Sequence, residues 1–153
     1  MDGAPENHHG TAIALAGRAV LIRGAPGSGK SDLALRCLAV APTALIPSPV
    51  TLIADDRVDI RRHGEVLRVE APETIRGKLE VRGVGIVEVP VSASAELVLV
   101  ADLTTPDKIE RMPDPPPHTE IMGIRLPLIH LAPFEASAPV KLLLTLRKTF
   151  SVM

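Results

Sequence analysis

Short apolar runs separated by turn-forming residues dominate the first half of the chain. Thr11–Leu15 and Ala19–Arg23 are two such runs, and they predict a pair of strands that turns at Gly17. A third run, Val50–Ala54, predicts a buried strand that ends at an acidic pair. The pattern therefore indicates a sheet whose strands are largely covered.

Two segments have the composition or the spacing of helices. Residues 32–39 are good helix formers, and this helix is expected to end near Val40 because Pro42 follows. Near the C-terminus, residues 140–150 predict a second helix, because apolar residues recur there at helical spacing. These residues are Leu142, Leu143, Leu146 and Phe150, and we expect them in the core or at a subunit interface.

Further strands are predicted in the second half of the chain. Residues 57–62 and 65–69 flank His63-Gly64, which predicts a hairpin. Three more strands are expected, at residues 81–89, 97–101 and 124–131. Five prolines lie between Pro106 and His118, so this stretch is predicted to be a mobile loop.

A complete phosphate-binding motif lies between the second predicted strand and the first predicted helix. Its sequence fits G-x-x-x-x-G-K-[ST], and strand, glycine loop and helix together aim backbone N–H groups at phosphate. Lys30 would neutralise the β- and γ-phosphates, and the Ser31 hydroxyl would ligate Mg²⁺. A glycine-rich turn that binds nothing is disfavoured, because motif and context agree. The candidate nucleotide-binding residues are Gly24, Ala25, Pro26, Gly27, Ser28, Gly29, Lys30 and Ser31.

The acidic pair Asp55-Asp56 is the second chemical signal. It follows an apolar strand, and ligands bind at the carboxyl ends of strands in open α/β sheets. One carboxylate can hold Mg²⁺, directly or through water, and the other can accept a proton from an attacking hydroxyl. A helix cap or a turn is the alternative role, which the phosphate loop makes less favourable.

Composition narrows the functional classes. The chain has 153 residues, 46% of them hydrophobic, and a net charge of −1, which fits one catalytic domain spanning residues 1–153 with a flexible tail at 1–8. The near-neutral charge and the lack of Trp and Tyr argue against nucleic-acid binding. Cys37 is the single cysteine and is expected to be a core thiol. Without a long apolar run or a signal peptide, we expect a cytoplasmic protein with no membrane association.

Three local matches show that the sequence resembles the HPr kinase/phosphorylase family, bacterial enzymes that act on a seryl residue of the phosphocarrier HPr. The first is His9-Gly10, with His9 placed 15 residues before the phosphate loop. The second is Leu52–Ile60, which resembles the family's double-aspartate segment. The third and most specific is Leu79–Val87, Leu-Glu-Val-Arg-Gly-Val-Gly-Ile-Val, which is similar to the family's L-E-I-R-G-x-G-I-I signature.

The resemblance implies an α/β fold, a phosphate-loop kinase core with a central mixed β-sheet and flanking helices. It implies that ATP binds at the loop, with Mg²⁺ held by Ser31 and Glu80. Asp55 or Asp56 would accept the proton of the substrate serine, and Asp56 is the favoured base. His9 would lie near that carboxylate, unless it belongs to the tail, and Arg111 would stabilise the transferring phosphoryl group. A homo-hexamer that phosphorylates HPr within phosphotransferase-system regulation is also implied.

The sequence departs from the family in three places. Fewer than ten residues precede His9, so we expect the kinase core without the family's N-terminal domain. The connection Ala41–Pro49 is longer than in the family. The family's basic R-P-G-R-N loop, which is tied to dephosphorylation, corresponds here to Leu128–Pro133, which contains no arginine. Kinase activity is therefore expected, with phosphorylase activity weak or absent.

Two other functions remain open at this point. One is a different phosphate-loop enzyme, such as a small-molecule kinase or a phosphoenolpyruvate carboxykinase-like protein, which the 79–87 segment disfavours. The other is a non-catalytic nucleotide-sensing module, which the intact set of Lys30, Ser31, the acidic pair and Glu80 disfavours.

Overall fold

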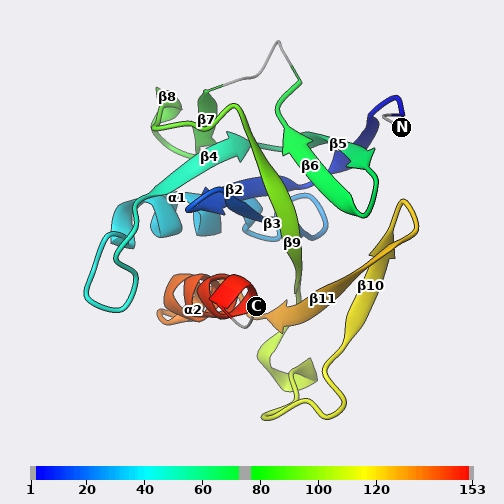
Figure 1. The fold of residues 1–153 in the computed structure, drawn as a ribbon. Helices are drawn as coiled ribbons and strands as arrows, with labels where there is room; N and C mark the ends of the chain where they lie inside the picture. Colours follow the sequence, from blue (N-terminus) through cyan, green and yellow to red (C-terminus); the bar gives the residue numbers. More distant parts are fainter. Residues whose placement is uncertain (1–2, 73–76, 152–153) are drawn as a thin grey trace.

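A mixed sheet is the centre of the computed structural model, which describes residues 3–72 and 77–151, and two helices cover one of its faces (Figure 1). The sheet order is β1-β5-β6-β9-β3-β2-β4, with β11 also paired to β9, and β10 to β11. Its strands are β1 Glu6–His9, β2 Thr11–Leu15, β3 Arg18–Arg23, β4 Val50–Ala54, β5 Arg57–His63, β6 Val66–Glu70, β9 Ser94–Leu103, β10 His118–Ile121 and β11 Ile124–Leu131. A separate hairpin comprises β7 Lys78–Val81 and β8 Gly85–Glu88. The helices are α1 Lys30–Val40, α2 Ala138–Ser151 and the short 3₁₀ turn η2 Pro106–Lys108. This arrangement confirms the predicted α/β class with a central mixed sheet and flanking helices.

Three parallel strands define the edge of the sheet that matters for function. β9 lies between β3 and β11 and pairs parallel to both. Their carboxyl ends, at Arg23, Leu103 and Leu131, therefore meet at one edge, which is where open α/β sheets bind ligands. Arg23 and Asp102 join two of these ends through a bidentate ion pair of 2.6 and 2.9 Å.

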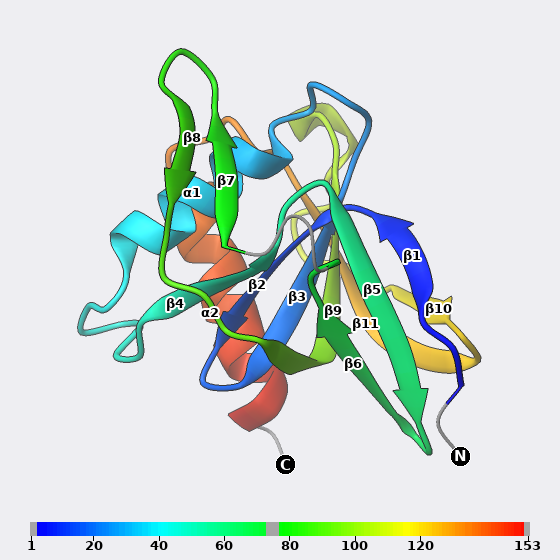
Figure 2. The ribbon, with the colours of Figure 1, turned by 90° about the horizontal axis from the view of Figure 1, so that it is seen from above.

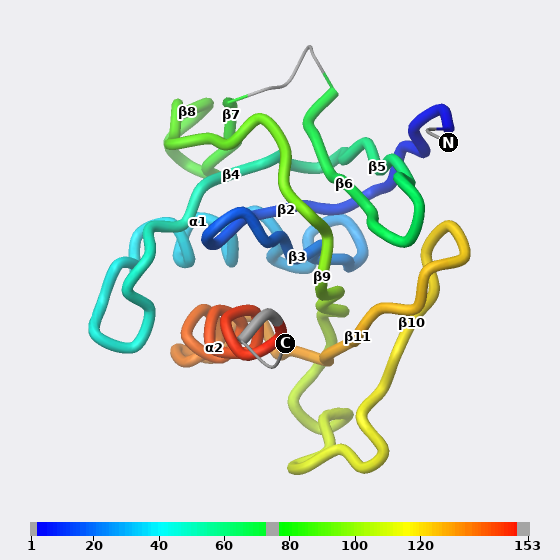
Figure 3. Tube along the Cα trace, viewed as in Figure 1, coloured from blue at the N-terminus to red at the C-terminus, as the bar shows by residue number. Residues whose placement is uncertain are grey.

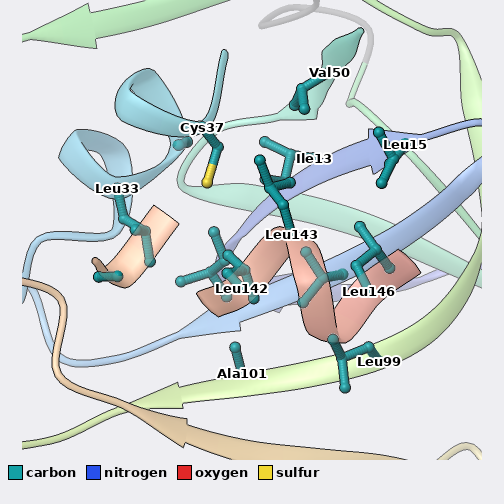
Figure 4. Packing of buried hydrophobic residues seen from close by; sticks show 14 of the residues in the cluster. Ile13, Leu15, Leu33, Cys37, Val50, Leu99, Ala101, Leu142, Leu143 and Leu146 are labelled. Carbon is teal, nitrogen blue, oxygen red and sulfur yellow. The ribbon is translucent and has the colours of Figure 1, made fainter. Parts of the chain in front are cut away.

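One hydrophobic core lies between the sheet and the two helices (Figure 4). Cys37 on α1 and the α2 leucines pack against sheet residues such as Ile13 and Leu99. Leu142, Leu143 and Leu146 are fully buried, so the helical spacing of apolar residues near the C-terminus correctly predicted a core helix. The Phe150 side chain lies outside the described part of the chain.

A second core fills the opposite face of the sheet. The backbone trace shows that the sheet curls (Figure 3). Successive side chains of β2 alternate between the two cores, Ala12 facing the second and Ile13 the first, because the strand has a period of two. Small residues such as Ala14 and Ala19 belong to the second core. Burial of both faces explains why β2 and β3 have nearly continuous apolar sequences.

Three details correct the expectations from sequence. Residues 6–8, expected in a flexible tail, belong to β1, which pairs antiparallel with β5. The single strand predicted at residues 81–89 is instead the β7–β8 hairpin, whose turn is closed by a 2.9 Å bond from Val84 N–H to the Val81 carbonyl. The proline-rich stretch ends in β10, which was not predicted. Among the described residues, no helix is long and apolar enough to cross a membrane.

Candidate nucleotide and phosphoryl-transfer site

The phosphate loop joins β3 to α1 at the functional edge of the sheet. Gly29 ends the loop with a left-handed backbone (φ 100°), and α1 begins at Lys30. A side chain at Gly29 would be strained by this φ, and its Cβ would lie 3.1 Å from the Phe134 ring. The Lys30 ammonium donates to the carbonyls of Gly24 (2.8 Å) and Ala25 (3.2 Å), which keeps its charge at the loop.

A chain of hydroxyl and carboxylate groups connects the loop to the acidic pair. Ser31 Oγ donates to Asp55 Oδ1 at 2.6 Å, and Thr11 Oγ1 donates to the same oxygen at 2.9 Å. Thr11 is fully buried, and its hydroxyl also accepts a long 3.4 Å bond from the Asp56 N–H. Asp55 is thus held by two donors, and Ser31 retains its lone pairs for a ligand.

The two neighbouring carboxylates have different surroundings. Asp55 is half-buried and bound to Ser31, whereas Asp56 is exposed and lines a cleft in front of the loop. Asp56 also has a left-handed backbone (φ 68°), which is uncommon for residues other than glycine. The structure therefore distinguishes the surroundings of the two carboxylates. The spacing of the residues in the sequence alone did not distinguish them.

The cleft measures about 870 Å³, and four segments that are distant in sequence line it, one of them at Phe134 after β11. Lys30 and Ser31 come from the loop, Asp56 follows β4, and Glu80 comes from β7. The β7–β8 hairpin lies beside α1 and forms the facing wall (Figure 2). Loop cation, carboxylates and a serine hydroxyl thus share one solvent-accessible space.

Six of the predicted site residues do not line this cleft: Gly24, Ala25 and Ser28 of the loop, Asp55, which is bonded to Ser31, and His9 and Arg111. His9 is exposed on β1, opposite Arg57 in register, although the adjacent Gly10 donates its N–H to the Asp56 carbonyl at 2.9 Å. Arg111 is exposed in the segment between η2 and β10. Within residues 3–72 and 77–151, no group of three His, Cys, Asp or Glu side chains has the arrangement of a metal site.

Sequence reasoning missed three residues near the loop. Thr11 gave a weak signal, as a hydroxyl in an apolar strand. Arg36 is half-buried on α1 and donates to the backbone carbonyls of Pro133 and, at 3.3 Å, Glu135. Phe134, between these two carbonyls, lines the cleft beside Gly29. Only the fold reveals these last contacts, because about a hundred residues separate Arg36 from its partners.

The fold and the site together define a phosphate-loop protein of the α/β class. A family model, the HPr Serine kinase C-terminal domain, matches residues 3–144. This chain therefore belongs to the HPr Serine kinase C-terminal domain family.

Individual relatives agree with this assignment. The HPr kinase/phosphorylase of Caldicellulosiruptor bescii is 36% identical over 132 residues, 79% of this chain and 40% of the relative. That of Alkaliphilus metalliredigens is 36% identical over 129 residues, 77% of this chain and 39% of the relative. The chain thus spans about two fifths of the length of these curated relatives.

A solved structure shares the fold over nearly the whole chain. It is the Hpr(Ser) kinase/phosphatase from Coxiella burnetii, with a TM-score of 0.77 and 24% identity. The match covers 96% of this chain and 97% of that one. The match confirms the predicted α/β fold over nearly the whole chain.

Proposed function

We propose that this protein is an ATP-dependent protein serine kinase whose substrate is an HPr-type phosphocarrier. The observation that carries the proposal is the Ser31–Asp55–Thr11 hydrogen-bond chain behind a cleft that also exposes Lys30 and Asp56. The names of the matched relatives support the choice of HPr over a small metabolite.

The residues present fit a nucleotide with its magnesium ion. Ser28 Oγ is buried in the loop without a hydrogen-bond partner among the described residues, a group that a repositioned loop or a phosphate oxygen would satisfy. Ser31 and Glu80 would hold Mg²⁺, with Asp55 orienting the Ser31 hydroxyl. The ion, when bound, would neutralise phosphate charge.

Transfer would proceed by attack of the substrate serine oxygen on the γ-phosphorus, with cleavage of its bond to the β–γ bridging oxygen and release of ADP. Asp56 would accept the serine proton, because its carboxylate is exposed in the cleft where a protein side chain can enter. Lys30 would stabilise charge on the transferring group. We retain His9 and Arg111 as groups that reach the site only when the protein substrate or the nucleotide is bound.

The forward reaction is expected to dominate. Attack of inorganic phosphate on phosphoserine brings two anions together, so the site must supply additional positive charge. Leu128–Pro133 contains no arginine or lysine. Arg36 reaches the Pro133 carbonyl, but it is already bound to Asp32 at 3.0 Å and to two backbone carbonyls. We therefore expect weak phosphorylase activity.

We also propose a homo-hexamer, as the family resemblance implies, and a cytoplasmic location, where ATP is available. Sedimentation of the purified protein tests the first, and fractionation of the source cells tests the second.

Transfer of labelled phosphate from ATP to purified HPr tests the proposed function. The expected product carries the label on serine, and an HPr in which that serine is replaced by alanine is the matched control. Label on histidine, or on metabolites but not HPr, would favour a different phosphate-loop enzyme. ATP binding without any transfer would favour a nucleotide sensor.

A further inference from the structure

A second cavity of about 570 Å³ lies on the other side of the phosphate loop. It lies at the carboxyl ends of the three parallel strands, between Ser28 and the segments that follow β9 and β11. A 2.9 Å bond from Thr104 N–H to the Leu131 carbonyl ties these two segments together. Cavities of this size are typical of small-molecule sites, and this edge is where α/β sheets bind ligands.

Phe134 lines both this second cavity and the phosphate cleft. Its side chain is 74% exposed, in a chain that has only two phenylalanines and no tryptophan or tyrosine. The backbone on both sides is nevertheless fixed, because Arg36 donates to the carbonyls of Pro133 and Glu135. The Glu135 side chain also forms an ion pair with Lys141, with 3.0 Å between the carboxylate oxygen and the ammonium nitrogen. An exposed aromatic ring on a fixed backbone is a preformed stacking surface.

We propose that the second cavity binds the nucleoside part of the donor nucleotide, with the base stacked on the Phe134 ring; this inference rests on the proposed function, in which ATP is the donor. Lys30 and Ser31 place the phosphates in the first cleft. Phe134 lines both cavities, so a nucleotide lying against its ring would have its phosphates in the first cleft and its nucleoside in the second cavity.

The lining of the second cavity has the chemistry that a nucleoside needs. Leu103, Pro106 and Pro133 provide apolar contacts for a flat base. The neighbouring threonines at 104 and 105 provide hydroxyl groups, and Lys108 provides a cation, all in the same lining. Glu135 also lines the cavity, and its carboxylate is paired with Lys141 of α2 at 3.0 Å.

Calorimetry with two ligands tests this inference: ATP, and inorganic tripolyphosphate, which has the phosphates but no nucleoside. Phe134→Ala should weaken ATP binding about 5- to 150-fold, the range expected when a base loses its stacking partner. Binding of tripolyphosphate should be unchanged. Phe134→Tyr should restore ATP affinity, whereas Phe134→Leu should not. Met112→Ala is the matched control, because Met112 is an 82% exposed apolar residue that lines neither cavity.

Phenylalanine ring signals give an independent readout. In protein labelled with ¹³C-phenylalanine only two ring systems contribute, and the Phe134→Tyr spectrum assigns them. ATP should shift the Phe134 ring signals through the ring current of the base, and tripolyphosphate should not.

The possible outcomes separate this inference from the proposed function. An equal loss of ATP and tripolyphosphate binding in Phe134→Ala would show that the ring only supports Gly29, and would overturn the inference. Unchanged ATP affinity, or a wild-type protein that binds no ATP, would overturn it too. If the ATP-specific loss is observed but HPr is not phosphorylated, the nucleoside site stands and the kinase proposal fails. If HPr is phosphorylated and Phe134→Ala does not change ATP binding, the kinase proposal stands and the nucleoside site is overturned.

Discussion

Replacing Asp55 and Asp56 one at a time by asparagine should separate a structural carboxylate from a catalytic one. Asp55 accepts hydrogen bonds from Ser31 at 2.6 Å and from Thr11 at 2.9 Å, whereas Asp56 is exposed in the cleft. Asparagine has nearly the same shape but carries no charge and cannot act as a base at neutral pH. The two variants should therefore fail in different assays.

The expected loss of stability follows from the contacts of each residue. A hydrogen bond to a charged group contributes about 1.5–3 kcal/mol, against about 0.5–1.5 kcal/mol for a neutral pair. Each of the two bonds of Asp55 should therefore lose about 1–1.5 kcal/mol, so Asp55→Asn should lower the free energy of unfolding by about 2–3 kcal/mol. Asp56→Asn should change it by less than about 0.5 kcal/mol, because the side chain is exposed and asparagine tolerates a φ of 68°.

The expected loss of activity has the opposite order. Without its general base, Asp56→Asn should transfer phosphate to HPr about 10²- to 10⁴-fold more slowly, with ATP affinity nearly unchanged. Urea denaturation, calorimetry with ATP and initial rates of transfer measure the three quantities. Asp107→Asn is the matched control, because Asp107 is an exposed carboxylate outside both cavities. Transfer by Asp56→Asn within tenfold of the wild-type rate would refute the assignment, and so would unchanged stability in Asp55→Asn.

Three further predictions concern the loop, the buried thiol and the direction of the reaction. Lys30→Ala should reduce transfer at least about 100-fold while the protein stays folded by circular dichroism, since the bonds of Lys30 to the carbonyls of Gly24 and Ala25 lie within the loop; normal turnover would contradict this. Burial raises the pKa of Cys37 to about 12, so a thiol reagent at pH 8 should label the native protein slowly and the urea-unfolded protein quickly. Equal labelling rates would show that the thiol is accessible. Seryl-phosphorylated HPr incubated with millimolar phosphate should release little pyrophosphate, and release at the kinase rate would show that Arg111 or Arg125 supplies the charge missing from Leu128–Pro133.

Pattern and motif predicted the parts of this protein that depend on contiguous residues. The strands at Thr11–Leu15 and Val50–Ala54 are apolar because both faces of the sheet are covered, and that burial is visible in the sequence itself. The phosphate loop is equally local, since its geometry depends on the glycines and on the start of α1.

Elements that depend on partners were harder to predict. Strand β1, Glu-Asn-His-His, has no apolar pattern, because it pairs through its backbone with β5 and is mostly exposed. A bend at Gly10 separates β1 from β2 and lets β1 pair with β5. Only glycine fits this bend without a shift, because a Cβ at Gly10 would lie 2.8 Å from the Ile22 carbonyl oxygen. The hairpin was mistaken for one strand at residues 81–89. Val84 in the turn and Ile86 in β8 are apolar and continue the apolar pattern through the turn, although both are exposed.

The sequence alone determined which chemistry the site contains: a phosphate loop with its lysine and serine, and a carboxylate pair at the end of a strand. Tertiary structure decided what each of these groups contacts. Thr11 meets Asp55 across 44 positions of the chain, and that contact distinguishes Asp55 from Asp56. Arg36 reaches the Pro133 carbonyl across 97 positions and so fixes Phe134 beside the loop. Local sequence cannot encode such pairs, because they form only when the curled sheet and the helices that pack on it bring distant segments together.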